Sequence, residues 1–303
     1  MANAKKHHFV PQFLLRRFAD TNEKLIVHRL GARESFISTV RNVGHRNLGH
    51  TVVRPGQEPD HTSMETAMSL VEGEAASAIA KLDSIRLRRV PDEFRSPIAW
   101  FLALQWYRNR FLFHIMSERM DPQKDQLDAD LLKYLVLSNL SMSVLSPWAI
   151  RDDPQARPKD TWNPLVSELL SSEMNWSCYR PRGMPLIVSD TSVCFSGARD
   201  GFTADVPAAY LDHGVGAGFH DARRITVPLG SNLGLLISRD ERDADRIRAA
   251  EFNRYTIFNS REFIAYAPDW PTRHPSLNSE LHSNLFTQRI VAPTFMWGYK
   301  GNV

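Results

Sequence analysis

The stretch "IAWFLALQWYRNRFLFHIM", residues 98–116, is apolar on most sides and indicates where the centre of the fold lies. A helix that is apolar all round is buried in the core. Pro91 or Asp92 can begin this helix, and Pro97 falls early enough in it to be tolerated. We therefore expect a central buried helix over residues 92–120.

Helical patterns also dominate the residues on both sides of that stretch. Apolar residues recur at helical spacing across residues 63–84, and further helices are expected over 127–145 and 164–174. Residues 146–163 are rich in proline and charge, so we expect a long loop there. The middle of the chain is therefore expected to be helical.

Short β-like runs occupy the two ends of the chain. The runs KLIVHRL (24–30) and ESFISTV (34–40) predict a hairpin, and apolar runs separated by Gly, Pro and Asp follow residue 175. A helix over 240–259 and a last strand within REFIAYAP (261–268) complete the pattern. Strands and helices do not alternate, which argues against a doubly wound parallel sheet. We expect an α+β fold, with the helical middle packed on a mostly antiparallel sheet and a β-rich C-terminal half.

The length of 303 residues suffices for one large core or two modest ones. We expect a single domain over residues 1–303. Its parts are an N-terminal α+β segment (1–62), a helical region (63–175), a β-rich region (176–270) and an irregular tail (271–303).

Composition places the chain among ordinary globular proteins, with 43% hydrophobic and 23% charged residues. A net charge of +3 does not by itself indicate a nucleic-acid partner. The two cysteines, Cys178 and Cys194, form no CxxC pair, so we expect buried free thiols. The basic start is followed by no apolar signal core, and no run of about 18 apolar residues exists. These features favour a cytoplasmic protein that does not span a membrane, and they leave the oligomeric state open.

The opening "KKHHFVPQFLLRRFAD", residues 5–20, combines two adjacent histidines with a Val-Pro step. In an extended segment His7 and His8 point to opposite faces, so the pair cannot easily chelate one ion. Pro11 is favoured at the start of the helix that follows. We expect His7 to be structural and His8 to face a site. The alternative is that both histidines order the strand through buried hydrogen bonds.

Further short motifs follow that opening in a fixed order along residues 5–265. They lie at residues 7–18, 42–44, 72–76, 103–110, 187–190 and 225–229. With their spacing, and with the HHxVPxxxL opening as the specific part, they make the chain similar to a bacterial family known as domain of unknown function 4238. Val193 and Asn109 stand near places where that family commonly has proline, which affects local turns only. The resemblance implies no settled activity.

Four polar residues in otherwise apolar runs are the candidate site. Asp190 ends the apolar run PLIVSD, where it can form a metal-ligand pair or a His-carboxylate dyad with His8. Gln105 and Arg108 lie three residues apart on one face of the central helix, and a buried Arg fits a carboxylate or phosphate best. The alternatives are an Asp190 that only bonds its own turn, and an Arg108 that pairs with Asp190 or Glu72 inside the fold.

Two nuclease patterns remain open. The His-Val-Pro step with Asn22 fits the start of HNH-type nucleases, although a strand follows where their helix should be. Arg108 with His114 fits the short Arg-to-His spacing of HEPN ribonucleases. P-loop, GxGxxG, GxSxG and HExxH motifs are absent from the sequence, and the glycines of 214–218 predict a flexible loop.

These residues lead to two hypotheses of different classes. The first is a hydrolase acting on a phosphate-containing substrate, most plausibly a nuclease of a bacterial defence or toxin system. In it His8, Asp190, Arg108 and Gln105 form the catalytic site, and His8 and Asp190 hold a divalent metal ion. The second is a non-catalytic binding or scaffold protein with a buried His/Arg/Asp network. The first requires His8, Asp190 and Arg108 to converge.

Overall fold

The computed structural model describes residues 6–29, 32, 34–52, 58–108, 129–150, 153, 156–198 and 219–273. The chain divides into two compact units, each built from two stretches of sequence. Unit 1 comprises residues 1–12 and 44–174, and unit 2 comprises residues 13–43 and 175–303. Whether the units form one domain stays a prediction. Within the described ranges, we find no helix with the length and apolar character needed to cross a membrane.

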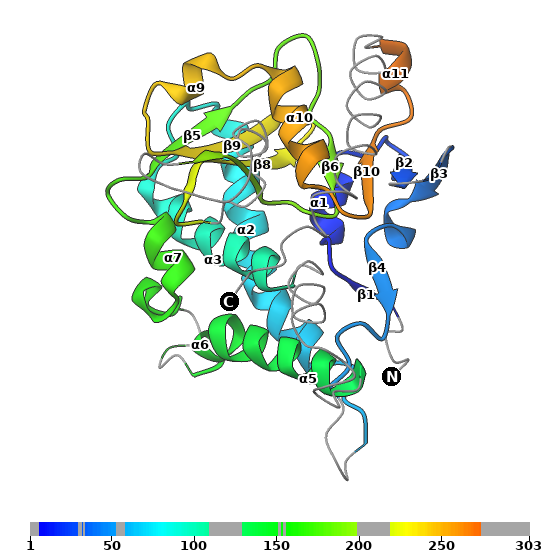
Figure 1. The fold of residues 1–303 in the computed structure, drawn as a ribbon, viewed down its shortest axis with the longest axis vertical. Helices are drawn as coiled ribbons and strands as arrows, with labels where there is room; N and C mark the ends of the chain where they lie inside the picture. The colour runs from blue at the N-terminus through cyan, green and yellow to red at the C-terminus, as the bar shows by residue number, and fades with distance from the viewer. Residues whose placement is uncertain are drawn as a thin grey trace, which may run out of the picture. The chain divides into compact units, whose positions relative to one another are not determined.

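Unit 1 is mainly helical, as its sequence predicts (Figure 1). Its short strands β1 (Lys6–His8) and β4 (His45–Asn47) pair antiparallel. Its helical elements are α2 (Ser63–Ile85), α3 (Asp92–Arg108), α5 (Ala129–Leu140), the π-helical turn η2 (Ser141–Leu145), α6 (Ser146–Ala149), the 3-10 turn η3 (Asp160–Trp162) and α7 (Pro164–Leu169).

Helix α3 confirms the central buried helix over its described part. Residues 98–104 are buried without interruption, and Pro97 lies inside the helix, as expected. Its continuation over 109–120 lies outside the described residues. Helix α2 packs against α3 with an apolar face that includes Met68 and Ile79. The core of unit 1 therefore forms between these two helices.

The segment expected to be a long loop contains ordered turns instead. Within 146–163, α6 and η3 form, and Asp160 accepts hydrogen bonds from Trp100 Nε1 at 2.9 Å and Ser96 Oγ at 2.7 Å. The prediction of a long loop from the proline content was therefore wrong for these turns. The hydrogen bonds of Asp160 to the distant helix α3 hold the segment in place.

Unit 2 contains two antiparallel sheets. In the first, the strand order is β3-β2-β10-β6, and in the second it is β5-β9-β8-β7. The strands are β2 (Lys24–Arg29), β3 (Ser35–Thr39), β5 (Asn175–Tyr179), β6 (Val188–Ser189), β7 (Cys194–Ala198), β8 (Ala222–Gly230), β9 (Leu233–Ser238) and β10 (Phe263–Tyr266). The helical elements are α1 (Gln12–Arg16), which starts at the boundary with unit 1, the 3-10 turn η1 (Val40–Asn42), α9 (Asp243–Arg246), α10 (Ala249–Asn259) and α11 (Trp270–Arg273).

Helix α10 packs against β6, β7 and β8 and so covers part of both sheets (Figure 1). The predicted hairpin is confirmed, with Ile26 of β2 opposite Ile37 of β3. The helix expected over 240–259 is divided into α9 and α10, because Ile247 is extended. Helices and antiparallel sheets together confirm the α+β class.

Candidate functional site

The β1–β4 pair positions the two adjacent histidines of unit 1. His7 pairs with Arg46 and His8 with His45, so their side chains alternate across the strand. The Gly44 carbonyl accepts the N–H groups of Phe9 and Val10 at 2.8 and 3.2 Å. Gly44 has a φ of 64°, a conformation that favours glycine. This turn explains why a glycine belongs to the family-like motif at residues 42–44.

His7 makes a structural contact, as its sequence position predicts. It is 1% exposed, and its Nδ1 accepts the backbone N–H of His50 at 2.8 Å. The two rings stack with centroids 5.6 Å apart and an interplanar angle of 17°. Because a backbone N–H can only donate, the lone pair of His7 must lie on Nδ1. His7 therefore fixes the loop that carries His50.

His50 and Glu65 form a His-carboxylate dyad. His50 Nδ1 lies 2.5 Å from Glu65 Oε1 in the first turn of α2. Burial lowers the pKa of His50 despite the opposing effect of Glu65, and the positive charge of Arg108 adds to the lowering. Burial raises the pKa of Glu65, but the His50 hydrogen bond and the nearby positive charge of Arg108 help to lower it below its usual value. An ionised Glu65 then holds the Nδ1–H of His50, which leaves the lone pair on Nε2.

Arg108 lies at the end of α3 with a side chain that is only 1% exposed. Its Nη1 donates to Glu72 Oε1 at 2.6 Å, to the His8 carbonyl at 3.3 Å and to Met68 Sδ at 3.8 Å. Its Nε and Nη2 are buried and have no hydrogen-bond partner among the described residues. Gln105 Nε2, one turn earlier, is also buried without such a partner in the described ranges. Buried donors in this state call for a ligand, a water or an ion.

Four polar residues of unit 1 are therefore connected. His7 holds His50, His50 bonds Glu65, and the Arg108 charge is close enough to shift the pKa of both dyad members. Among the described residues, His7, His50 and Glu65 also form one group whose ligand atoms lie within 4.8 Å of one another. The arrangement offers a basic nitrogen, a fixed cation and a set of metal-type ligands.

The predicted site residues are distributed over both units. In unit 1 His8 is half-buried, and Arg108 bonds its carbonyl. The His8 ring lies 5.5 Å from that of His45, and its Nδ1 lies 3.4 Å from Gln12 Nε2. Glu72 is the protein partner of Arg108, one of the alternatives that the sequence left open.

Asp190 belongs to unit 2, so its convergence with His8 and Arg108 stays a prediction, as does the metal ion expected between His8 and Asp190. Its carboxylate accepts the backbone N–H groups of Arg261, Glu262 and Phe263 at 2.9 to 3.3 Å. Burial raises the pKa of Asp190 to about 6, although the backbone hydrogen bonds oppose this effect. In unit 2 the residue ties the end of β6 to the start of β10.

We expect Asp190→Ala to lower the free energy of unfolding by about 2–4 kcal/mol, because buried N–H groups lose their acceptor. Chemical denaturation at pH 8, where the carboxylate is ionised, measures the change. Glu241→Ala, at an exposed position, is the control and should shift stability by no more than about 0.5 kcal/mol. Equal stability of the two variants would mean that water replaces the carboxylate at no cost.

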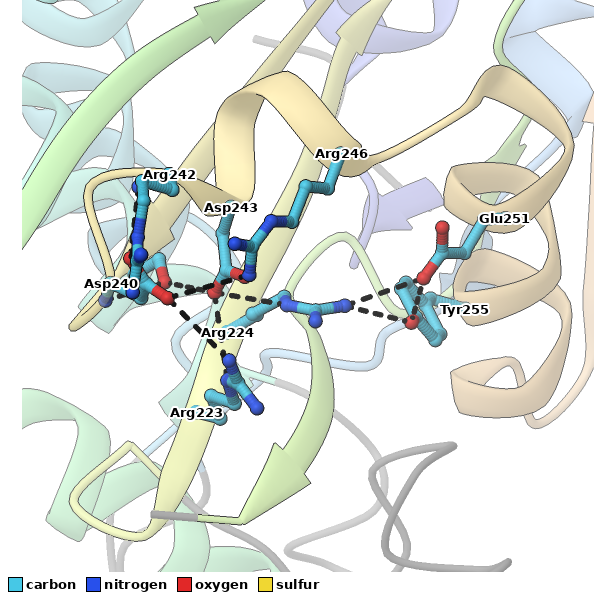
Figure 2. A network of polar contacts seen from close by, with 9 residues as sticks. Arg223, Arg224, Asp240, Arg242, Asp243, Arg246, Glu251 and Tyr255 are labelled. Carbon is cyan, nitrogen blue, oxygen red and sulfur yellow. Dashed lines mark hydrogen bonds and ion pairs between the residues drawn. The ribbon is translucent and has the colours of Figure 1, made fainter. Parts of the chain in front are cut away.

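A second polar network in unit 2 connects β8, α9 and α10 (Figure 2). The fully buried Asp243 accepts from Ser238 Oγ at 2.5 Å and lies 3.0 Å from Arg224 Nε. Arg224 Nη1 also contacts Glu251 and the Tyr255 hydroxyl at 3.3 and 3.2 Å. Burial and the Glu251 hydrogen bond raise the pKa of Tyr255 to about 12, so it stays a donor. Each charged group faces an opposite charge within the network, so we interpret it as structural. Asp243 Oδ1 and Arg224 Nε are nevertheless buried without a hydrogen-bond partner among the described residues.

Asp243→Asn should destabilise unit 2 by about 1–3 kcal/mol, since the amide keeps the volume but loses the charge that faces Arg224. Thermal or chemical unfolding measures the effect. Asp240→Asn is the matched control, because its contacts with Arg223, Arg242 and Arg246 lie toward solvent, where ion pairs contribute little. A larger loss in the control than in Asp243→Asn would contradict this assignment.

Sequence reasoning missed His50 and Glu65. His50 stands in the segment expected to be an irregular loop, and Glu65 reads as an ordinary first-turn acid of a helix. The available signal was the density of histidines between residues 41 and 62. Arg110, His114 and the glycines of 214–218 lie outside the described residues, so the ribonuclease-like spacing and the loop stay predictions.

The fold and the unit 1 site define an α+β protein with a His-carboxylate dyad next to a buried arginine. A family model described as "Protein of unknown function (DUF4238)" matches residues 6–269. The chain therefore belongs to this family, which confirms the resemblance found in the sequence. Comparison with curated proteins and with solved structures gave no significant match.

Proposed function

We propose that this protein is a cytoplasmic hydrolase that acts on a phosphate-containing substrate, with nucleic acid as the substrate class. In this proposal Arg108 binds the phosphate and the His50–Glu65 dyad activates the attacking water. His8 contributes through its carbonyl, which orients Arg108, and Gln105 supplies a further donor. Service in a bacterial defence or toxin system is the setting that we propose by analogy alone.

The buried guanidinium of Arg108 is the single observation that carries this proposal. Its Nε and Nη2 have no acceptor among the described residues, although Nη1 is held by Glu72. Two adjacent N–H groups of one guanidinium match two oxygens of a phosphate. Since a buried unsatisfied donor is costly, a ligand that supplies the oxygens would bind with a favourable free energy.

The dyad provides the second part of the chemistry. Glu65 fixes the His50 tautomer, so Nε2 has the lone pair that can accept a proton from water. The water oxygen then attacks phosphorus, the bond to the leaving oxygen breaks, and the proton passes to that oxygen. A carboxylate that orients a histidine is the arrangement on which general-base hydrolysis depends.

A substrate panel tests the proposal. Purified protein is incubated with bis(p-nitrophenyl) phosphate, p-nitrophenyl phosphate, single- and double-stranded DNA, and RNA, with and without Mn²⁺ or Zn²⁺. We expect hydrolysis of at least one substrate. Arg108→Lys keeps the charge but loses the planar fork, so its kcat/KM should fall about 10–100-fold. Arg89→Lys, at an exposed position just before the same helix, should retain the rate.

A complete lack of hydrolysis and of phosphate binding would favour the second function, a scaffold with a buried network. The observation behind that alternative is the low exposure of Arg108 together with its Glu72 partner. A scaffold predicts that substitutions at this pair change stability alone. A hydrolase predicts that they change both stability and rate.

A further inference from the structure

We propose that His7, His50 and Glu65 bind one divalent metal ion of the zinc class, with a water molecule in the remaining position. The role of this ion in hydrolysis rests on the proposed function, whereas its binding does not. The ligand set differs from the His8 and Asp190 pair that the sequence suggested. It lies wholly within unit 1, on residues that the structure describes.

Distances decide whether the three side chains can meet one ion. Their ligand atoms lie within 4.8 Å of one another. Zinc binds nitrogen and oxygen at about 2.0–2.2 Å, so neighbouring ligands of a tetrahedral ion lie about 3.4 Å apart. The widest pair must therefore approach by up to about 1.4 Å, and the 2.5 Å contact between His50 and Glu65 must lengthen by about 0.9 Å. Glu65, whose side chain is 33% exposed, is free to rotate for both changes.

The present hydrogen bonds show what an ion must displace. His7 Nδ1 accepts the His50 N–H at 2.8 Å, so an ion bound to that nitrogen takes the place of this hydrogen bond. One proton is shared between His50 Nδ1 and Glu65 Oε1. Without that proton, both atoms could bind a metal ion. A metal ion takes the place of that proton and binds both atoms. Two imidazoles and one carboxylate suit zinc, manganese or iron better than magnesium or calcium.

The surrounding elements hold these ligands from different directions. His7 is fixed in β1 by its pairing with β4, His50 follows β4 in the next turn, and Glu65 lies in the first turn of α2. The nearby charge of Arg108 opposes a cation, but Glu72 neutralises it at 2.6 Å. Three protein ligands with one open position are characteristic of catalytic zinc sites, whereas structural sites use four.

In the metal-bound form the ion activates the water, in place of the His50 imidazole. A bound divalent ion lowers the pKa of its water toward neutrality. The resulting hydroxide forms the new O–P bond, the bond to the leaving oxygen breaks, and the proton released by the water ends on that oxygen. Arg108 then neutralises the phosphate oxygens beside the ion.

Metal titration of the purified full chain tests the site without an activity assay. After dialysis against a chelator, Zn²⁺ is added in a calorimeter, and Co²⁺ is added while its visible spectrum is recorded. We expect one ion per chain and a Co²⁺ spectrum of low coordination number. Glu65→Gln and His50→Ala should each raise the dissociation constant for the metal at least about 100-fold. Loss of a direct ligand weakens metal binding more than loss of a residue that only bonds a ligand, which costs about 10–100-fold.

His61→Ala is the matched control, because this histidine bonds Thr51 in the same loop and is outside the ligand set. Circular dichroism checks that each variant folds. If His50→Ala does not fold, Glu65→Gln still tests the proposal. Absence of stoichiometric binding, or an equal loss in His61→Ala, would overturn the metal site. Hydrolysis that persists without any metal would leave the proposed function intact, with His50 as the base.

Discussion

Replacing His50 by glutamine is expected to reduce kcat/KM for phosphate ester hydrolysis about 100- to 10,000-fold, the usual contribution of a positioned acid-base group. Glutamine is polar and of similar size, so it can still bond Glu65, but it has no lone-pair nitrogen to accept a proton. The His7 contact goes to the backbone N–H of residue 50 and survives the substitution. The loss should therefore appear in the rate, with folding preserved.

His61→Gln provides the comparison for this result. Its ring contacts Thr51 Oγ1 at 2.9 Å, and it lies in the same histidine-rich segment. We expect its kcat/KM to stay within about twofold of the unmodified protein, as for residues outside a catalytic unit. Equal rates for His50→Gln and the unmodified protein, measured with the same substrate, would remove the dyad from the mechanism.

Glu72→Ala is expected to destabilise the protein by about 3–5 kcal/mol, since it leaves a buried guanidinium without its counter-charge. The Arg108 side chain is 1% exposed, so solvent compensates poorly for a lost counter-charge in the ligand-free protein. Glu74→Ala is the matched control on the same helix. Its partner Arg157 is 3.6 Å away and both side chains are exposed, so the loss should be below about 1 kcal/mol. Urea unfolding of the two variants measures the difference.

The double variant Glu72→Met/Arg108→Met separates charge from packing. Apolar replacement of both partners of a buried ion pair is often neutral or stabilising. We therefore expect the double variant to recover most of the stability that Glu72→Ala loses. It should not hydrolyse the substrate, because it lacks the guanidinium of Arg108. A Glu72→Ala protein as stable as Glu74→Ala would show that Arg108 has solvent or another partner.

Arg108 and Gln105 could be predicted because they interrupt an apolar helix, and a polar residue in such a run needs a partner. The alternation of His7 and His8 follows from strand geometry alone. The dyad could not be predicted in this way. Its two members come together only because β1 pairs with β4 and the next turn reaches the start of α2.

The fold, like the site, could be predicted where contacts are local in sequence and not where they are long-range. Local periodicity indicated α2, α3 and the β2–β3 hairpin, because their partners are near in sequence. It could not indicate that β10 pairs with β2, since the pattern of one strand does not identify a distant neighbour. The separation into two units likewise depends on such long-range contacts, because each unit combines two stretches of the chain.

The central claim is that Arg108 binds a phosphate through N–H groups that the described protein residues leave unpaired. The most direct test is the arginine Nε–H signal in a ¹H–¹⁵N NMR spectrum, assigned to this residue with Arg108→Lys. We predict that inorganic phosphate or a nucleoside monophosphate moves this signal saturably, and that equal concentrations of chloride do not. A signal that phosphate leaves unmoved would contradict the account and favour a purely structural network.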